Sequence, residues 1–220
     1  MKTQNELTGG TLNTRQKTVQ LAKMGLLAAI SILLMALVHF PIFPPAPFLK
    51  YDPADIPILI ASFSFGPLAG LLLTVIVAVI HGISFSASGP YGVLMNIIAT
   101  GALVLVAGFI YRFSPSFQRG KRLPEELGGS RHIVFFFQIY GGKTRKMAAV
   151  ALICGTLAMV LIMIPANLIV TPLFMGAPVE AVKALLLPAI LPFNLIKAGL
   201  NSLITFLLYK RISKYLHANR

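Results

Sequence analysis

Six apolar runs alternate with short polar segments along the chain. They cover residues 19–38, 56–65, 68–85, 93–113, 147–170 and 185–209. A helix that crosses the ~30 Å hydrocarbon core of a bilayer needs roughly 20 apolar residues. Five runs approach or exceed that length, whereas residues 56–65 would reach only about half-way across. The pattern predicts an all-α membrane protein with six transmembrane helices, in which the short second helix is completed by its neighbours or sheltered by protein.

The composition agrees with a membrane protein, because 56% of the residues are hydrophobic, 11% are charged and the mean hydropathy is +0.82. These values lie outside the range of soluble domains. We therefore expect one multi-pass domain over residues 19–213. Residues 1–18 and 214–220 form cytosolic tails in this interpretation.

The net charge of +13 comes from basic residues that cluster at the ends of the apolar runs. With both termini in the cytosol, only Lys50 and Lys183 of the 19 lysines and arginines fall in outer loops, and Lys197 falls inside a helix. The positive-inside rule favours this orientation and makes nucleic-acid binding a poor explanation of the charge. Residues 114–146 become a long basic cytosolic loop, whose apolar patch at 132–140 suits either the membrane interface or a locally ordered loop.

Little in the sequence suggests enzymatic chemistry. The single cysteine, Cys154, allows no internal disulfide, and we identify no metal site, no cofactor motif and no phosphate-binding glycine loop. A six-helix membrane enzyme, such as an intramembrane protease or a lipid phosphatase, is the alternative from another class. It would need a nucleophile with a base, an acid pair or metal ligands inside the bundle. The sequence offers His39 and His81 on different helices, and no membrane-embedded acid pair apart from the cap at Asp52 and Asp55.

The segment FLKYDPADIP (48–57) stands directly before the short second run. Asp52 suits a helix N-cap, Pro53 suits the first helical position, and Asp55 places a second carboxylate at the positive end of the helix dipole. This structural role does not exclude ligand binding at the same place. The proline-rich residues before it predict a stiff, extended loop that could fold over a pocket.

Polar residues inside the apolar runs fall at one depth when each is counted along its helix. On the last helix, Asn194, Lys197 and Asn201 are three and four residues apart and form one polar stripe. Polar residues in membrane helices usually face the protein interior and mark substrate sites. We expect a pocket near the outer surface, and its candidate residues are Asn167, Asn194, Lys197, Asn96, His81, Leu49, Lys50, Tyr51 and Asp55.

Each of these residues also has a purely structural interpretation. Lys197 could extend its amine towards the membrane surface along its own stem. Asn167, between Pro165 and Pro172, could repair a broken helix backbone, Asn96 could join two helices, and His81 could simply pack. The common depth favours the pocket.

Several neutral amides, one cation and nearby aromatic rings suit a flat heteroaromatic ligand with carbonyl and N–H edges. An inorganic cation would need more anionic oxygens. The nearby aromatic residues are Phe40, Phe43, Phe48, Tyr51, Tyr91 and Phe193.

A stripe of small residues runs along the first helix, with spacings of three, four and seven. Its members are Ala22, Gly25, Ala29 and Ala36. Such a stripe lets another backbone approach closely. It serves either packing within the bundle or docking of a partner subunit.

Several sequence segments resemble the S components of energy-coupling factor (ECF) vitamin transporters, and most closely the riboflavin-binding members. They are FPIFPPAPFLKYDPADIP (40–57), FGPLAG (65–70), GPYGVLMNIIATG (89–101) and NLIK (194–197). The first is the most specific. Loop 114–146 is longer than in the family.

The resemblance implies a six-helix bundle in a bacterial plasma membrane that binds riboflavin from the outside as a transported ligand. Its partners would be a transmembrane coupling protein and two ATPase subunits; an S component for another vitamin is the alternative within the family. In similar proteins the positions of Asn167, Asn194 and Lys197 contact the flavin ring, and residues 49–55 close over it. The docking face is similar to the stripe around Gly25 and Ala29.

Overall fold

The computed structural model describes residues 14–44, 46–84, 88–113 and 144–217. These ranges contain all six predicted apolar runs apart from Phe85. The apolar patch at 132–140, nearly all of loop 114–146, and residues 1–13 and 218–220 of the two predicted tails lie outside the described residues.

The described helices follow the predicted runs. They are α1 (Thr14–Leu37), α2 (Asp55–Phe65), α3 (Pro67–Ser84), α4 (Gly89–Arg112), α7 (Thr144–Met175), and a last continuous helix made of α8 (Val179–Leu185), η2 (Leu186–Ile190) and α9 (Leu191–His217). Five of these are long and apolar enough to cross a membrane, and α2 is the one shorter apolar helix among the described residues. The expected six-helix membrane bundle is confirmed.

The short helix α2 lies in the middle of the bundle. Its residues from Asp55 to Ser64 are all buried, and it contacts α1, α3, α4 and α9. An apolar helix of this length is too short to reach both surfaces of a bilayer. It is therefore surrounded by neighbouring protein instead of by lipid. The alternative of shelter by protein is therefore the one that holds.

The expected start of α2 needs a correction. The helix begins at Asp55 with Ala54 as its N-cap, and Asp52 lies one turn earlier. Asp52 Oδ1 still accepts a hydrogen bond from the Ala54 N–H at 3.2 Å, and the Ile56 N–H donates to the Pro53 carbonyl at 3.2 Å. Asp52 thus stabilises a turn that leads into the helix. Asp55 opens the helix instead of occupying its third position.

Two glycines set how closely the helices approach. Gly66, at φ +110°, is the single residue between α2 and α3, and a Cβ there would meet the Arg112 guanidinium. Gly155 lies where α7 crosses α4, and a Cβ there would come within 2.7 Å of the Leu103 carbonyl oxygen. The sharp turn and the close α4–α7 contact both depend on the missing side chain.

Helix α7 is longer than the apolar run predicted, because it continues through Pro165 and Pro172 to Met175. It ends at Gly176, which has φ +61°, and the Ala177 N–H donates to the Pro172 carbonyl at 3.2 Å. This is the glycine-terminated Schellman arrangement, so the end is set by Gly176 and not by either proline.

The last helix starts earlier than expected. It begins at Val179, six residues before the predicted run of 185–209, and it contains Pro188, within a turn of π-helix at Leu186–Ile190, and Pro192. The two prolines lack the N–H groups that a regular α-helix would use. A wider π-turn accommodates such an interruption without ending the helix.

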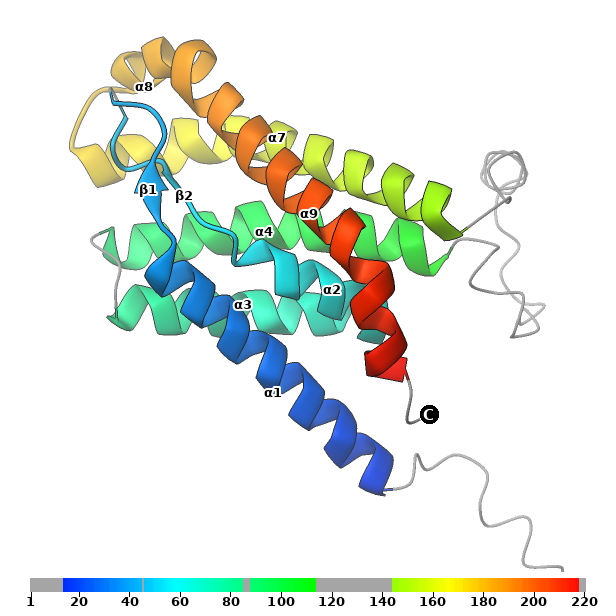
Figure 1. Cartoon of the computed structure of the whole chain (residues 1–220). Helices are drawn as coiled ribbons and strands as arrows, with labels where there is room; N and C mark the ends of the chain where they lie inside the picture. Colours follow the sequence, from blue (N-terminus) through cyan, green and yellow to red (C-terminus); the bar gives the residue numbers. More distant parts are fainter. Residues whose placement is uncertain (1–13, 45, 85–87, 114–143, 218–220) are drawn as a thin grey trace, which may run out of the picture.

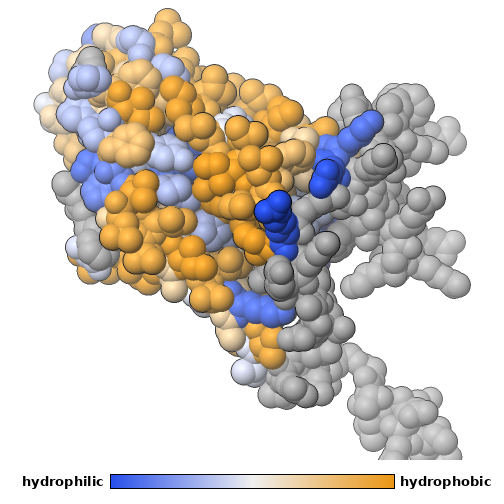
Figure 2. All heavy atoms as spheres, viewed as in Figure 1, coloured by the Kyte–Doolittle hydropathy of each residue, from blue (hydrophilic) through white to orange (hydrophobic). Residues whose placement is uncertain are grey.

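The strands β1 (Phe40–Pro41) and β2 (Lys50–Tyr51) form a small antiparallel hairpin that pairs Phe40 with Tyr51. Figure 1 shows this hairpin, α8 and the C-terminal end of α7 gathered at one end of the bundle, with the start of α1 and the end of α9 at the other. Hydrophobic residues cover most of the view in Figure 2, and hydrophilic residues collect at the hairpin end and at the opposite tip. The face seen in Figure 2 therefore has the apolar band of a membrane protein between two polar ends.

The small-residue stripe of α1 faces away from the bundle. Ala22, Gly25 and Ala29 are exposed and Ala36 is half-buried. A Cβ at Gly25 would meet nothing within 4 Å. Packing within the bundle, one of the two expected roles, is therefore wrong for the first three residues.

Candidate functional site

A cavity of about 480 Å³ lies at the hairpin end of the bundle. Its walls come from α3, α4, α7, α9, the end of α1 and the loop that carries the hairpin. The lining residues are Met35, His39, Pro47, Phe48, Leu49, Lys50, Asp52, His81, Ser88, Tyr91, Gly92, Met95, Asn96, Ala99, Met159, Met163, Asn167, Val170, Thr171, Phe174, Phe193, Asn194 and Lys197. The volume is that of a site for a drug-sized organic molecule.

On the α7 wall, Asn167 is held by its own helix. Its Nδ2 donates to the Met163 carbonyl at 2.8 Å, and its Oδ1 accepts from Thr171 Oγ1 at 2.9 Å. The carbonyls that lose a donor to Pro165 and Pro172 belong to Leu161 and Leu168, four residues earlier. Asn167 binds neither, so backbone repair is not its role. One amide N–H remains for a ligand.

On the facing wall, Asn194 comes one turn after the π-helical segment. Its Nδ2 donates to the Ile190 carbonyl at 2.8 Å, whereas its Oδ1 is buried and has no partner among the described residues. The side chain is 1% exposed. A buried carbonyl oxygen without a donor costs about 1–3 kcal/mol, so this wall offers an acceptor to a ligand N–H.

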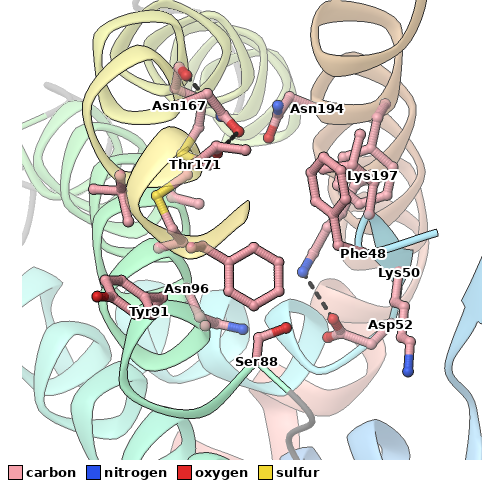
Figure 3. Close-up of a pocket in the computed structure, with 18 of the residues that line it drawn as sticks. Phe48, Lys50, Asp52, Ser88, Tyr91, Asn96, Asn167, Thr171, Asn194 and Lys197 are labelled. Atoms are coloured by element: carbon pink, nitrogen blue, oxygen red, sulfur yellow. Dashed lines mark hydrogen bonds and ion pairs between the residues drawn. The ribbon is translucent and has the colours of Figure 1, made fainter. Parts of the chain in front are cut away.

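Lys197 lies one turn below Asn194 and is buried. Its Nζ donates to Asp52 Oδ2 at 2.8 Å. Figure 3 shows the amine and the carboxylate meeting at the edge of the open space that Asn167, Thr171 and Asn194 also border. The amine does not extend towards the membrane surface, so the snorkelling interpretation of Lys197 is wrong.

The α4 wall carries Asn96, and α3 contributes His81. The Oδ1 of Asn96 lies 3.2 Å from Thr100 Oγ1, whose single proton is shared with the nearer Asp55 Oδ1 at 2.7 Å, and the Asn96 amide nitrogen points towards the open space in Figure 3. The contact of Asn96 with Thr100 stays within α4 and does not itself join two helices. His81 is half-buried and lines the cavity, so packing alone does not describe its position.

Two predicted residues, Tyr51 and Asp55, lie behind the cavity instead of lining it. Asn201 connects them: it accepts from the Tyr51 hydroxyl at 3.0 Å and donates to Asp55 Oδ2 at 2.9 Å. Asp55 also accepts from Thr100 Oγ1 at 2.7 Å. Burial, followed by the Asp52 and Asp55 carboxylates, raises the pKa of Tyr51, so its hydroxyl keeps the proton that it donates. These residues tie the hairpin, α2, α4 and α9 together beneath the site.

The apolar part of the cavity is aromatic and rich in methionine. Of the aromatic residues expected near the site, Phe48, Tyr91 and Phe193 line it, and Phe40, Phe43 and Tyr51 do not. Phe174 stands 6.2 Å, ring centre to ring centre, from both Phe48 and Tyr91. Flat rings and flexible thioethers suit a planar aromatic ligand.

Several lining residues were not predicted. Thr171 and Phe174 lie four and seven residues after Asn167, so they share its helical face, and this spacing could have identified them. Asp52 was assigned individually to the helix start, and otherwise only as part of the segment 49–55 that the resemblance implies closes over the ligand. Met35, His39 and Ser88 carry no comparable signal in the sequence.

Residues 19–209 match the family described as ECF transporter, substrate-specific component. The chain is 26% identical to the riboflavin transporter RibU of Staphylococcus aureus (strain TCH60), over 91% of this chain and 94% of that protein. It is 28% identical to the riboflavin transporter FmnP of Bacillus subtilis (strain 168), over 93% and 97%.

One solved structure with the same fold is described as "Structure and mechanism of the S component of a bacterial ECF transporter". The TM-score is 0.67 at 27% identity, and the match covers 91% of this chain and 99% of that one. The sequence comparisons and the structure comparison therefore all cover the helices that build the cavity.

Proposed function

Because this chain belongs to the family of substrate-specific components of ECF transporters, which are membrane transport subunits and not enzymes, we propose that it captures riboflavin in the cavity at the hairpin end. The cavity opens to the extracellular side in this proposal. The ligand then passes to an ATP-driven coupling module of a transmembrane coupling protein and two ATPase subunits.

The observation that carries the proposal is the pattern of free donors and acceptors around the cavity. Asn194 offers a buried acceptor, and Asn167 and Lys197 each retain N–H donors. One edge of the flavin ring presents a carbonyl, an N–H and a second carbonyl in a row. Such an edge can meet the acceptor with its N–H and the donors with its carbonyl oxygens.

The rest of the cavity supports the same ligand. Phe48, Tyr91, Phe174 and Phe193 offer aromatic surfaces to a flat tricyclic ring. The polar residues Lys50 and Ser88, which also line the cavity, suit the hydroxyl groups of a ribityl chain. The names of the two relatives, both riboflavin transporters, agree with this choice.

The exposed stripe of Ala22, Gly25 and Ala29 on α1 is where we place the coupling protein. Small residues on an exposed helix face let a partner helix approach closely. The stripe leaves space for such a partner because nothing in the described part of the chain lies within 4 Å of a Cβ at Gly25.

Titration of the detergent-purified chain with riboflavin tests the proposal. We expect the flavin fluorescence to be quenched with one equivalent of ligand, because a ring stacked on aromatic side chains loses its emission. No quenching at micromolar riboflavin would refute riboflavin as the ligand. Displacement by a different vitamin at a lower concentration than riboflavin would point to an S component for that vitamin.

A further inference from the structure

Asp52 is the only carboxylate among the described residues that line the cavity. It is 5% exposed. Neither its place before α2 nor the need for a helix cap explains why a buried carboxylate should face a ligand cavity. The contacts of Asp52 point to a second role.

The Lys197 ammonium has three N–H groups and uses one of them on Asp52 Oδ2, at 2.8 Å. It has no other hydrogen-bond partner among the described residues. An ammonium on a four-carbon stem can adopt many rotamers, and each orients the remaining donors differently. The single charged contact therefore decides where the two spare donors point.

Asp52 itself is held from two sides. Its Oδ1 accepts from the Ala54 N–H at 3.2 Å, and its backbone carbonyl accepts from Asn201 Nδ2 at 3.0 Å. Asn201 stands one turn beyond Lys197 on the same face of α9. The carboxylate is thus fixed relative to the helix that carries the lysine.

We propose that Asp52 is a positioning residue of the ligand site: it fixes the direction of the Lys197 ammonium and balances its charge, so that Lys197 can donate to an uncharged ring oxygen. This inference rests on the proposed function, since it takes Lys197 as a ligand contact. Asp52 acts through Lys197 and need not touch the ligand.

A positioning role for Asp52 predicts a distinctive pattern of binding energies. Without Asp52, the ammonium is buried without its counter-charge and is free to turn, so ligand binding weakens. Without Lys197, Asp52 has nothing to position, and its own removal costs no further affinity. Residues that act as one unit give non-additive effects, whereas independent residues give effects that add in free energy.

Four proteins test this: the wild type, Asp52→Asn, Lys197→Met, and the double variant, each titrated with riboflavin. Asparagine keeps an oxygen for the Ala54 N–H and is as good at helix starts as aspartate, so the turn before α2 is preserved. We expect each single change to weaken binding about tenfold or more, and the double variant to match Lys197→Met within about twofold.

Lys50→Met provides the matched control. Lys50 also lines the cavity and is close to Asp52 in the chain, but it is exposed, and Figure 3 draws its amine away from the Asp52–Lys197 pair. The losses from Asp52→Asn and Lys50→Met should multiply. If Asp52→Asn alone proves too unstable to purify, the comparison of Lys197→Met with the double variant remains, since that background removes both charges.

The outcomes separate the positioning role from riboflavin binding itself. A double variant that binds about tenfold more weakly than Lys197→Met would overturn the positioning role while leaving riboflavin binding intact. A wild type that does not bind riboflavin would overturn the proposed function and this inference with it. Equal affinities of Lys197→Met and the double variant support the role of Asp52.

Discussion

The three side chains that we assign to the flavin edge differ in how the protein restrains them. Asn167 is held at both ends of its amide, by the Met163 carbonyl and by Thr171. Asn194 is held only through its nitrogen, and Lys197 only through one ion pair. These hydrogen bonds leave one free acceptor, on α9, and free N–H donors on both the α7 and the α9 walls. The protein alone therefore sets where the cavity offers donors and where it offers an acceptor.

The first prediction concerns the side-chain oxygen of Asn194. Asn194→Ala removes the oxygen that we pair with the single ring N–H of riboflavin, and we expect about tenfold weaker binding, since such a bond is worth about 1–2 kcal/mol. Titration of both proteins with riboflavin and with N3-methylriboflavin measures this. The methylated ligand should bind the wild type poorly and lose little further in the variant.

An equal loss for both ligands on Asn194→Ala would contradict that pairing. It would assign Asn194 to packing, because removal of a packing residue weakens both ligands alike.

Two helices that form the walls of the cavity contain prolines, and these prolines shape the site without ending the helices. α7 carries Pro165 and Pro172 through to Met175, and the last helix passes Pro188 by a π-turn. The cavity wall therefore includes the turn of α7 that carries Thr171 and Phe174. A helix that stopped at the first proline would lack both.

The exposed face of α1 gives a prediction about partners. Ala29→Leu adds bulk to the stripe that we assign to the coupling protein, so uptake in cells should fall at least about tenfold while riboflavin binding by the purified chain stays unchanged. Radiolabelled riboflavin uptake and the fluorescence titration measure the two effects. Ala184→Leu, at an exposed alanine on α8, is the matched control and should change neither.

Normal uptake with Ala29→Leu would show that the coupling protein docks elsewhere. Weakened binding by the purified variant would instead mean that α1 senses the ligand site from its outer face.

In the molecule as a whole, the start of α1 and the end of α9 lie at the opposite end of the bundle from the cavity. α1 begins and α9 ends at the end away from the hairpin (Figure 1). The positive-inside rule favours a cytosolic position for that end, because basic residues cluster there in the sequence. We therefore expect the cavity to face the outside.

Labelling of single cysteines checks this orientation. In a Cys154→Ser background, Lys183→Cys on α8 should react with a membrane-impermeant maleimide on intact cells, because α8 lies at the cavity end. Arg211→Cys, which is exposed near the end of α9, should react only after the membrane is permeabilised. The reverse pattern would place the cavity on the cytosolic side and refute extracellular capture.

The amino-acid sequence was enough to predict the membrane class, the number of helices and a group of polar residues at one depth. Run length decides whether a helix spans, and helical spacing decides which residues share a face, so both are local properties. Asn167, Asn194 and Lys197 could be chosen on this basis because a polar group in an apolar helix is costly unless it has a use.

The pairing of those polar groups, in contrast, could be seen only once the helices were placed in three dimensions. Asp52 was assigned to a helix start, yet it meets a lysine 145 positions later in the chain, and Tyr51 and Asp55 turned out to support the site from behind. No local pattern reports such contacts, because they arise when α9 crosses the start of α2 and burial forces each charge and amide to find a partner.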